Sequence, residues 1–174
     1  MTDNVASQPR KRIDSAVVWQ SRWMTLYKDH LLSNGGYELE YLRVDRSDSV
    51  IVLARQAGKF VLTEPQFRPG IGRRTLDFPG GRIDGTKPAI CAELTMRREL
   101  QLAEDVHVRL DQLTVRPLFV DSAFSSQKVF GFVSEIPEDT SLQGKLYTTN
   151  ELMEQLQCLQ CRAMLLEWRY RAGN

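Results

Sequence analysis

The sequence predicts an α+β fold in which helices cover both faces of a mixed β-sheet. Between Ala16 and Leu62, short apolar runs alternate with turn residues, a pattern that is typical of successive strands. Farther along, two segments have helical periodicity, one in the middle of the chain and one near its C-terminal end. A chain of 174 residues, 42% hydrophobic and 26% charged, can bury one core without disulfides or a structural metal.

We therefore expect one folded domain over residues 15–174. Its N-terminal antiparallel strands would occupy residues 15–46, its core residues 47–146 and its terminal helix residues 149–171. Residues 1–14 are polar and include the basic cluster Arg10-Lys11-Arg12, so we expect them to form a disordered leader.

Three aromatic residues, Trp19, Trp23 and Tyr27, lie in the predicted N-terminal strands. Large aromatic side chains bury much apolar surface and are more often found in a core than exposed. We expect two of these three residues to belong to the core.

The middle of the chain combines a loop, a helix and two strands. The segment Gln66–Gly85 is rich in glycine, proline and arginine, which predicts mostly loop. Pro88 suits the first turn of a helix from Ala89 to about Ala103, because a proline at that position loses no helical hydrogen bond. Val106–Leu118 and Val129–Ile136 are expected to be strands.

The C-terminal helix is predicted from its start signal and its periodicity. Thr148 and Glu151 have the spacing of a capping box. Apolar residues then recur at steps of three and four and would form one buried stripe, made of Leu152, Leu156, Leu159, Ala163, Leu166 and Tyr170.

The three cysteines are Cys91, Cys158 and Cys161, and this odd number cannot form a complete disulfide framework. Their number favours a reducing compartment, so we expect a cytoplasmic protein. Cys158 and Cys161 have CxxC spacing, but no second pair or histidine cluster completes four zinc ligands. We expect both to be buried as small apolar side chains of the terminal helix.

Charge and hydropathy exclude two classes of partner. Lys and Arg total 23 against 22 Asp and Glu, and this net charge of +1 argues against nucleic acid, which usually needs a basic excess. The longest apolar stretches are shorter than the ~20 residues of a membrane helix, so no membrane span is expected.

A glycine pair and a helical carboxylate suggest chemistry on a phosphate. Gly80 and Gly81 follow a predicted strand, and the helix after them ends in Arg98-Glu99-Leu100. Glycine lets the backbone approach a phosphate closely, and a helical carboxylate facing that loop can hold Mg²⁺. Taken alone, this combination is a weak signal.

With its neighbours, this combination resembles the Nudix family, in its ADP-ribose and nucleotide-sugar pyrophosphatase branch. The similarity lies in three stretches: Gln66-Phe67-Arg68-Pro69-Gly70, Thr75-Leu76-Asp77-Phe78-Pro79-Gly80-Gly81-Arg82-Ile83-Asp84 and Phe124-Ser125-Ser126-Gln127-Lys128-Val129. The resemblance implies an α/β/α sandwich, a homodimer and Mg²⁺-dependent cleavage of a nucleoside diphosphate linked to another group.

The resemblance also implies roles for individual residues. Arg68 and Arg82, together with the turn at Gly80 and Gly81, would contact the ligand, and Trp23 would stack on its base. Arg98 would have a structural role in the signature motif, and Glu99 would bind metal.

The departures from the family pattern predict impaired catalysis. The last two glutamates of the motif fall on Leu102 and Ala103, and the glutamate of a later loop, which assists metal binding or activates water, is matched by Gln127. Residues three and four apart share a helix face, so this face would carry Glu99 as its one carboxylate. Glu93 and Glu104 are alternative metal ligands, as is Asp84. We expect Mg²⁺ binding to be weak or absent.

Three functions are compatible with these residues. The first is a catalytically degenerate Nudix-like protein that binds a nucleotide-derived small molecule, with hydrolysis lost or strongly impaired. The second is an active Mg²⁺-dependent hydrolase of ADP-ribose or a nucleotide sugar, with a metal site rearranged around Glu99, Glu93 and Glu104. The third is a non-enzymatic, dimeric interaction module.

Overall fold

The computed structural model describes residues 10–173, which form two compact units. We call residues 10–47 and 119–127 the strand unit, and residues 48–118 and 128–173 the core unit. The sequence predicted one domain over residues 15–174, whereas the contacts within the chain divide it in two. No helix in the described part of the chain is long and apolar enough to cross a membrane.

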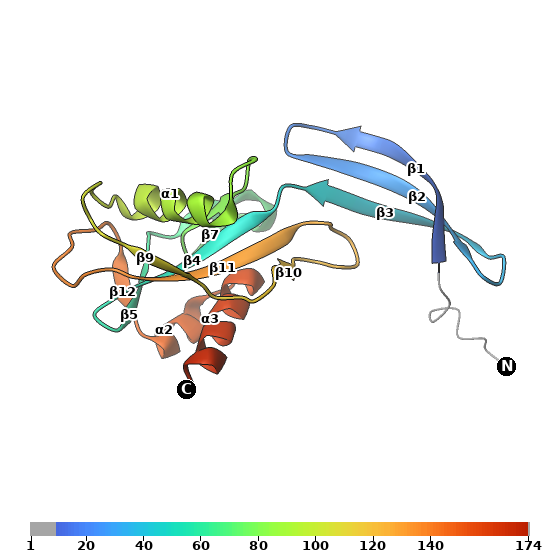
Figure 1. Cartoon of the computed structure of the whole chain (residues 1–174). Coiled ribbons are helices and arrows are strands. Elements are labelled where there is room, and N and C mark those ends of the chain that lie inside the picture. The colour runs from blue at the N-terminus through green and yellow to red at the C-terminus, as the bar shows by residue number, and fades with distance from the viewer. Residues whose placement is uncertain (1–9, 174) are drawn as a thin grey trace. The chain divides into compact units, whose positions relative to one another are not determined.

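The strand unit contains an antiparallel sheet in the order β1-β2-β3 (Figure 1). Its strands are β1 (Arg10–Gln20), β2 (Met24–Ser33) and β3 (Glu38–Arg46). Residues 10–14 of the expected leader are therefore part of β1, and residues 1–9 lie outside the described residues. The segment 119–127 joins this unit through a parallel bridge between Val44 and Ser125.

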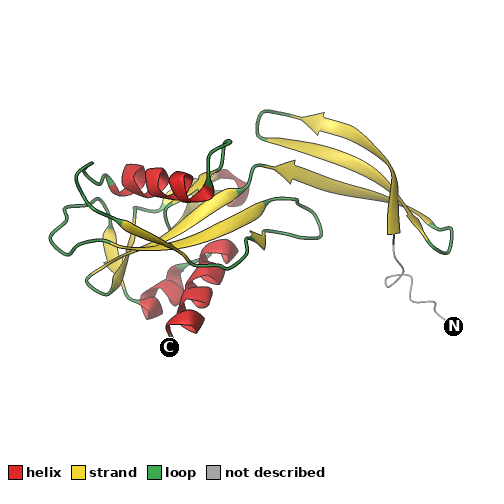
Figure 2. Cartoon of the chain, in the orientation of Figure 1, coloured by secondary structure: helices red, strands yellow, loops and turns green. Residues whose placement is uncertain are grey.

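The core unit contains a mixed sheet in the order β10-β11-β4-β5-β12, with β8 beside β4 and β9 beside β11. Its strands are drawn in yellow in Figure 2, with red helices next to them. Its central strands β4 and β11 are parallel, whereas β5 and β8 run antiparallel to β4. The strands are β4 (Ser49–Gln56), β5 (Lys59–Leu62), β8 (Gly80–Arg82), β9 (Arg109–Gln112), β10 (Leu118–Phe119), β11 (Lys128–Glu135) and β12 (Lys145–Tyr147). The predicted mixed sheet is confirmed.

Short paired strands interrupt the segment that was expected to be mostly loop. β6 (Gln66–Arg68) pairs with β7 (Arg73–Thr75), and a single 3₁₀ turn at Pro69–Ile71 connects them. Gly72 closes this turn with a φ of 64°, in the left-handed region that glycine adopts readily. The hairpin holds Arg68 and Asp77 near one another.

Helices cover both faces of the core sheet, as predicted. α1 (Pro88–Leu100) lies on one face, and α2 (Thr149–Gln155) and α3 (Leu159–Ala172) lie on the other (Figure 1). β4 is buried on both sides, which explains its continuous run of apolar residues. The cluster beneath α1 includes Val50, Val52, Ala92, Met96, Leu100 and Phe132.

α1 begins at Pro88, close to the predicted start, but it ends three residues earlier than expected. Gln101 adopts a left-handed conformation with a φ of 51°, and the N–H of Leu102 donates to the carbonyl of Arg97 at 3.0 Å. This is the Schellman pattern, in which a hydrophobic residue after the helix end usually packs back. Leu102 is that residue and is buried. Positions 102 and 103 lie after the end of the helix and are not on its face.

The helix expected over residues 149–171 is instead two helices. The capping box at Thr148 and Glu151 is present and starts α2. The chain is extended at Leu156 and again at Cys158, where α3 begins. This break shifts the helical phase, so the predicted stripe is wrong beyond it. Three of its members are exposed, Leu159, Leu166 and Tyr170, and the buried residues of α3 are Cys161, Met164 and Leu165.

Candidate functional site

Glu99 lies where the sequence predicted, beside the glycine pair. Its carboxylate accepts a hydrogen bond from the backbone N–H of Gly80, and Nη2 of Arg98 lies 3.3 Å from its Oε1. Burial raises the pKa of Glu99 above its ordinary value, although the bonds from Arg98 and Gly80 and the charge of Arg68 oppose this rise. The carboxylate of Glu99 therefore already has contacts with Arg98 and Gly80.

Gly81 allows α1 to pack closely against β8. A Cβ at this position would lie 2.5 Å from Oγ1 of Thr95, which is closer than real side-chain contacts. At Gly80 an added Cβ would lie 3.1 Å from the carbonyl oxygen of Val50. A packing requirement therefore accounts for both glycines, independently of their predicted contact with a ligand.

The alternative metal ligands are not gathered around Glu99. Glu93 pairs with Arg97, whose Nε lies 2.9 Å from its Oε1, and Glu104 is exposed after the helix end. Arg97 also donates to the carbonyls of Ala103 and Val106 and so fixes the loop that follows α1. Within residues 10–173, no group of three carboxylates includes Glu99. These positions do not fit a cluster of two or three Mg²⁺ ions.

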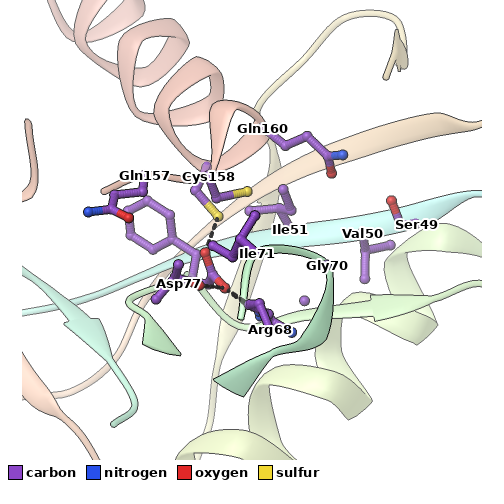
Figure 3. A pocket seen from close by; sticks show the side chains of 14 residues that line it. Ser49, Val50, Ile51, Arg68, Gly70, Ile71, Asp77, Gln157, Cys158 and Gln160 are labelled. Carbon is purple, nitrogen blue, oxygen red and sulfur yellow. Dashed lines mark hydrogen bonds and ion pairs between the residues drawn. The ribbon is translucent and has the colours of Figure 1, made fainter. Parts of the chain in front are cut away.

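A cavity of about 430 Å³ lies in the core unit beside the turn at Gly80 (Figure 3). Its wall is formed by the start of β4, the segment from Arg68 to Gly80 and the N-terminal turn of α3. The volume lies within the ~300–1,000 Å³ that is usual for small-molecule sites. Ser49 is one of the lining residues, and its hydroxyl is buried without a hydrogen-bond partner among the described residues.

Of the two predicted ligand-binding arginines, Arg68 lines the cavity. Its guanidinium forms an ion pair with Asp77, with Nε 2.8 Å from Oδ2. The hydroxyl of Thr75 donates to the same oxygen at 3.0 Å. Arg82 lies on β8 with an exposed side chain, and its carbonyl accepts the Cys91 thiol at 3.2 Å.

The cysteine pair lines the same cavity, which the sequence interpretation missed. Cys158 is the N-cap residue of α3 and is half-buried, and Cys161 is buried one turn later. A hydrogen bond with Cys161 lowers the pKa of Cys158 to about 6. The same bond, together with burial, raises the pKa of Cys161. The CxxC spacing was the one sequence signal for this pair. Asp77, whose carboxylate lies next to Cys161, is 84 residues away in the sequence and could not be assigned to it.

In the strand unit, the expectation that two of the three aromatic residues belong to the core is wrong. Trp19 is 51% exposed and Trp23 is 49% exposed, and the guanidinium of Arg22 lies 4.1 Å from the Trp23 ring centre. Tyr27 is partly buried, with Arg43 at 4.0 Å from its ring centre. The exposure of Trp23 is compatible with stacking on a base, and that role stays a prediction.

Gln127 is buried in the strand unit. Its N–H donates to the hydroxyl of Ser125 at 3.1 Å, and its carbonyl accepts the N–H of Val120 at 3.0 Å. The match of Gln127 to the loop glutamate of the family pattern rests on the sequence resemblance and stays a prediction.

Comparison with known proteins identifies the fold. No known family model matches the sequence, and no curated protein matches it. Among solved structures, a crystal structure of an ADP compounds hydrolase is similar with a TM-score of 0.80 at 18% sequence identity, and the match covers 95% of each chain. This similarity confirms the predicted fold class, an α+β fold with a mixed sheet and N-terminal antiparallel strands.

Proposed function

We propose that this protein binds a nucleoside-diphosphate-linked ligand, such as ADP-ribose or a nucleotide sugar, and that its hydrolysis is lost or strongly impaired. The observation that carries the proposal is the single carboxylate, Glu99, at the glycine turn, with its oxygens bonded to Gly80 and Arg98. The ligand class is supported by the similarity to an ADP compounds hydrolase and by the sequence resemblance to Nudix pyrophosphatases.

The loss of hydrolysis follows from the chemistry that the remaining groups can perform. Mg²⁺ takes near-octahedral oxygen coordination, usually from one or two carboxylates, water and substrate phosphates. Glu99 would hold at most one ion weakly with the phosphates. Leu102 is committed to packing after the helix end, and Gln127 cannot act as a general base because its amide does not accept a proton. Water activation is therefore unsupported.

The cavity beside Gly80 is the best candidate for the ligand. It combines an apolar wall with a few polar groups, which is typical of small-molecule sites. Arg68 lines the cavity and supplies a positive charge for a phosphate. Arg82 does not line this cavity, so its predicted contact would be with a part of the ligand that extends beyond the cavity.

A thermal-shift panel of ADP-ribose, nucleotide sugars and dinucleotides, each with and without Mg²⁺, tests the proposal. A ligand that binds only the folded state raises stability by about 2.7 kcal/mol at 100 times its Kd. We expect one member to stabilise the chain equally with and without Mg²⁺. Arg68→Ala should reduce this shift, whereas Arg73→Ala, a matched exposed arginine outside the cavity, should leave it unchanged.

An assay of AMP release from ADP-ribose separates the alternatives. Robust Mg²⁺-dependent turnover that is lost in Glu99→Gln would contradict impaired hydrolysis and favour the active enzyme. A melting temperature that responds to no nucleotide would favour the interaction module.

We also propose a homodimer formed through the strand unit. The observation that favours it is that β1 leaves Val17, Val18 and Trp19 about half exposed, so a partner surface could bury them. Light scattering should give twice the mass of the chain, and Val18→Asp should shift it to the monomer. A monomeric wild-type chain at micromolar concentration would contradict the dimer.

A further inference from the structure

The break before α3 brings two thiols to the first turn of a helix. Because the chain is extended at Cys158 and helical from Leu159 onward, Cys158 caps the helix and Cys161 lies in its first turn. The N-terminus of a helix favours negative charge, including that of a thiolate. Both sulfurs line the cavity of the core unit.

Asp77 presents one carboxylate oxygen to this thiol pair. Its Oδ2 is taken by Arg68 at 2.8 Å and by Thr75 at 3.0 Å, whereas its Oδ1 lies 3.9 Å from the sulfur of Cys161. Figure 3 shows Asp77 between Arg68 and the start of α3. Partners that fix the far oxygen of a carboxylate are typical of the groups that orient metal ligands.

The spacing of the three ligand atoms suits a tetrahedral metal ion. The two sulfurs and the carboxylate oxygen of Asp77 lie within 4.8 Å of one another. Among the described residues, no other group of three or more His, Cys, Asp or Glu side chains is so close together. Zn–S and Zn–O bonds of about 2.3 and 2.1 Å place tetrahedral ligands roughly 3.4–3.8 Å apart. Small side-chain rotations would therefore close the site around an ion.

The chemistry of the three groups selects the metal. Two thiolates and one carboxylate would place three negative charges together, and Arg68 balances one of them through the far oxygen of Asp77. Thiolate ligands favour Zn²⁺ over Mg²⁺ or Ca²⁺. Three protein ligands leave a fourth position, which would face the cavity and be filled by water or by a ligand donor.

We propose that Cys158, Cys161 and Asp77 form a Zn²⁺ site with one open coordination position in this cavity. The site is separate from the predicted Mg²⁺ position at Glu99 and needs no nucleotide. Its failure would therefore leave the proposed function standing, and the reverse is also true.

Cobalt binding to the full chain tests the site. The reduced protein, freed of metal with a chelator, is titrated with Co²⁺, which replaces Zn²⁺ and gives a thiolate-to-cobalt charge-transfer band in the near ultraviolet. We expect one equivalent to bind, with displacement by Zn²⁺ and a rise in melting temperature. Protein purified without chelator should contain zinc.

The variants assign the ligands. Cys158→Ser and Cys161→Ser should lose the band, and Asp77→Asn should keep it with weaker cobalt binding. Cys91→Ser is the matched control and should bind like the wild type, because this buried cysteine lies on α1 with its thiol bonded to Arg82. Serine is a favoured N-cap residue, so Cys158→Ser should fold even if Cys161→Ser does not.

Two outcomes would overturn the proposal. The first is the absence of a cobalt band in the reduced wild-type chain, or an equal band in Cys158→Ser. The second is a freshly purified chain that lacks zinc and has a mass two hydrogens lower than the reduced form, which would show a disulfide in place of the metal.

Discussion

The two units of this protein place their apolar residues in opposite ways. Nearly all buried apolar side chains of the described residues belong to the core unit, many of them on β4, β5 and the helices. Within residues 10–173, Val44 is the one buried apolar residue that belongs to the strand unit. The strand unit buries polar groups instead, namely Asp29, Ser33 and Gln127, and leaves Val18 53% exposed.

This difference shows that the two units are stabilised by different interactions. Burial of apolar area is the dominant favourable term in folding, and the core unit has that term in full. The strand unit depends on backbone pairing and on an ion network around Asp29, which accepts bonds from Ser15, Arg12 and Arg43. Its exposed apolar side chains would contribute stability only against a partner surface.

Truncation of a core aromatic should produce the largest effect and gives the sharpest test of the contrast. Phe60 is 1% exposed and contacts Phe78 and Trp168 edge to face at 5.7 and 4.9 Å. Phe60→Ala should lower the free energy of unfolding by about 3–5 kcal/mol, measured by urea denaturation. Trp19→Ala, measured at a concentration where the chain is monomeric, should change it by about 0.5 kcal/mol or less. Equal losses of unfolding free energy in Phe60→Ala and Trp19→Ala would contradict the difference between the two units.

Close packing between α1 and β8 predicts the next effect. In Gly81→Ala the new methyl would meet Oγ1 of Thr95 at 2.5 Å, so either the Thr95 side chain or the helix must shift, at a cost of about 1–3 kcal/mol. Gly70→Ala is the control, because its Cβ would meet nothing within 4 Å and its φ is not positive. A double-mutant cycle with Thr95→Ala should recover part of the loss. Strict additivity would show that Thr95 is not the obstacle.

The ion network of the strand unit should give a smaller effect that depends on pH. Burial raises the pKa of Asp29, but bonds from Ser15 and Arg43 and the charge of Arg43 outweigh it, so the pKa lies below its ordinary value. Its stabilisation is therefore present above the unfolded pKa of 3.8 and is lost as the pH falls through the lower folded value. Asp29→Asn should cost about 1 kcal/mol at pH 7.

Hydrogen exchange of β1–β3, followed by mass spectrometry, measures the local stability of the strand unit in the wild type and in Asp29→Asn. The difference between the wild type and Asp29→Asn should stay constant from neutral pH down to about 5 and shrink below about 4. A difference that grows as the solution becomes acidic would contradict the assigned sign.

The smallest effect concerns reactivity and leaves stability unchanged. In the metal-free chain, alkylation of Cys158 should rise with pH around a midpoint of about 6, because its pKa is lowered by the bond with Cys161. Buried Cys91 provides the comparison within the same unit and should react far more slowly under native conditions. Mass spectrometry of digested samples gives both rates. If the alkylation rate of Cys158 instead had its midpoint near pH 8.5, as for a free thiol, the result would contradict the hydrogen bond with Cys161.

Local sequence patterns predicted several elements because the determining contacts lie close together in the chain. Pro88 marks the start of α1, and the capping box of Thr148 and Glu151 starts α2, as expected. The stripe over the terminal helix failed at Leu159 because no local signal marks the extended residues before Cys158. An error of phase in a helix exchanges its buried and exposed faces.

The candidate site was predictable only in part. The position of Glu99 beside Gly80 followed from a motif whose spacing is fixed by one turn and one helix. The end of α1 could not be predicted from the motif. Arg97 holds the loop that follows the helix through the carbonyls of Ala103 and Val106, and no sequence pattern marks these bonds.

The sequence by itself determined that the chain forms an α+β fold with a mixed sheet and N-terminal antiparallel strands. The tertiary structure decided which surfaces are buried and which side chains meet. It placed Asp77 beside Cys161, 84 residues away in sequence, and left Trp19 exposed. The physical reason is that periodicity and capping depend on neighbours within a few residues, whereas burial and metal-ligand geometry depend on contacts between distant segments.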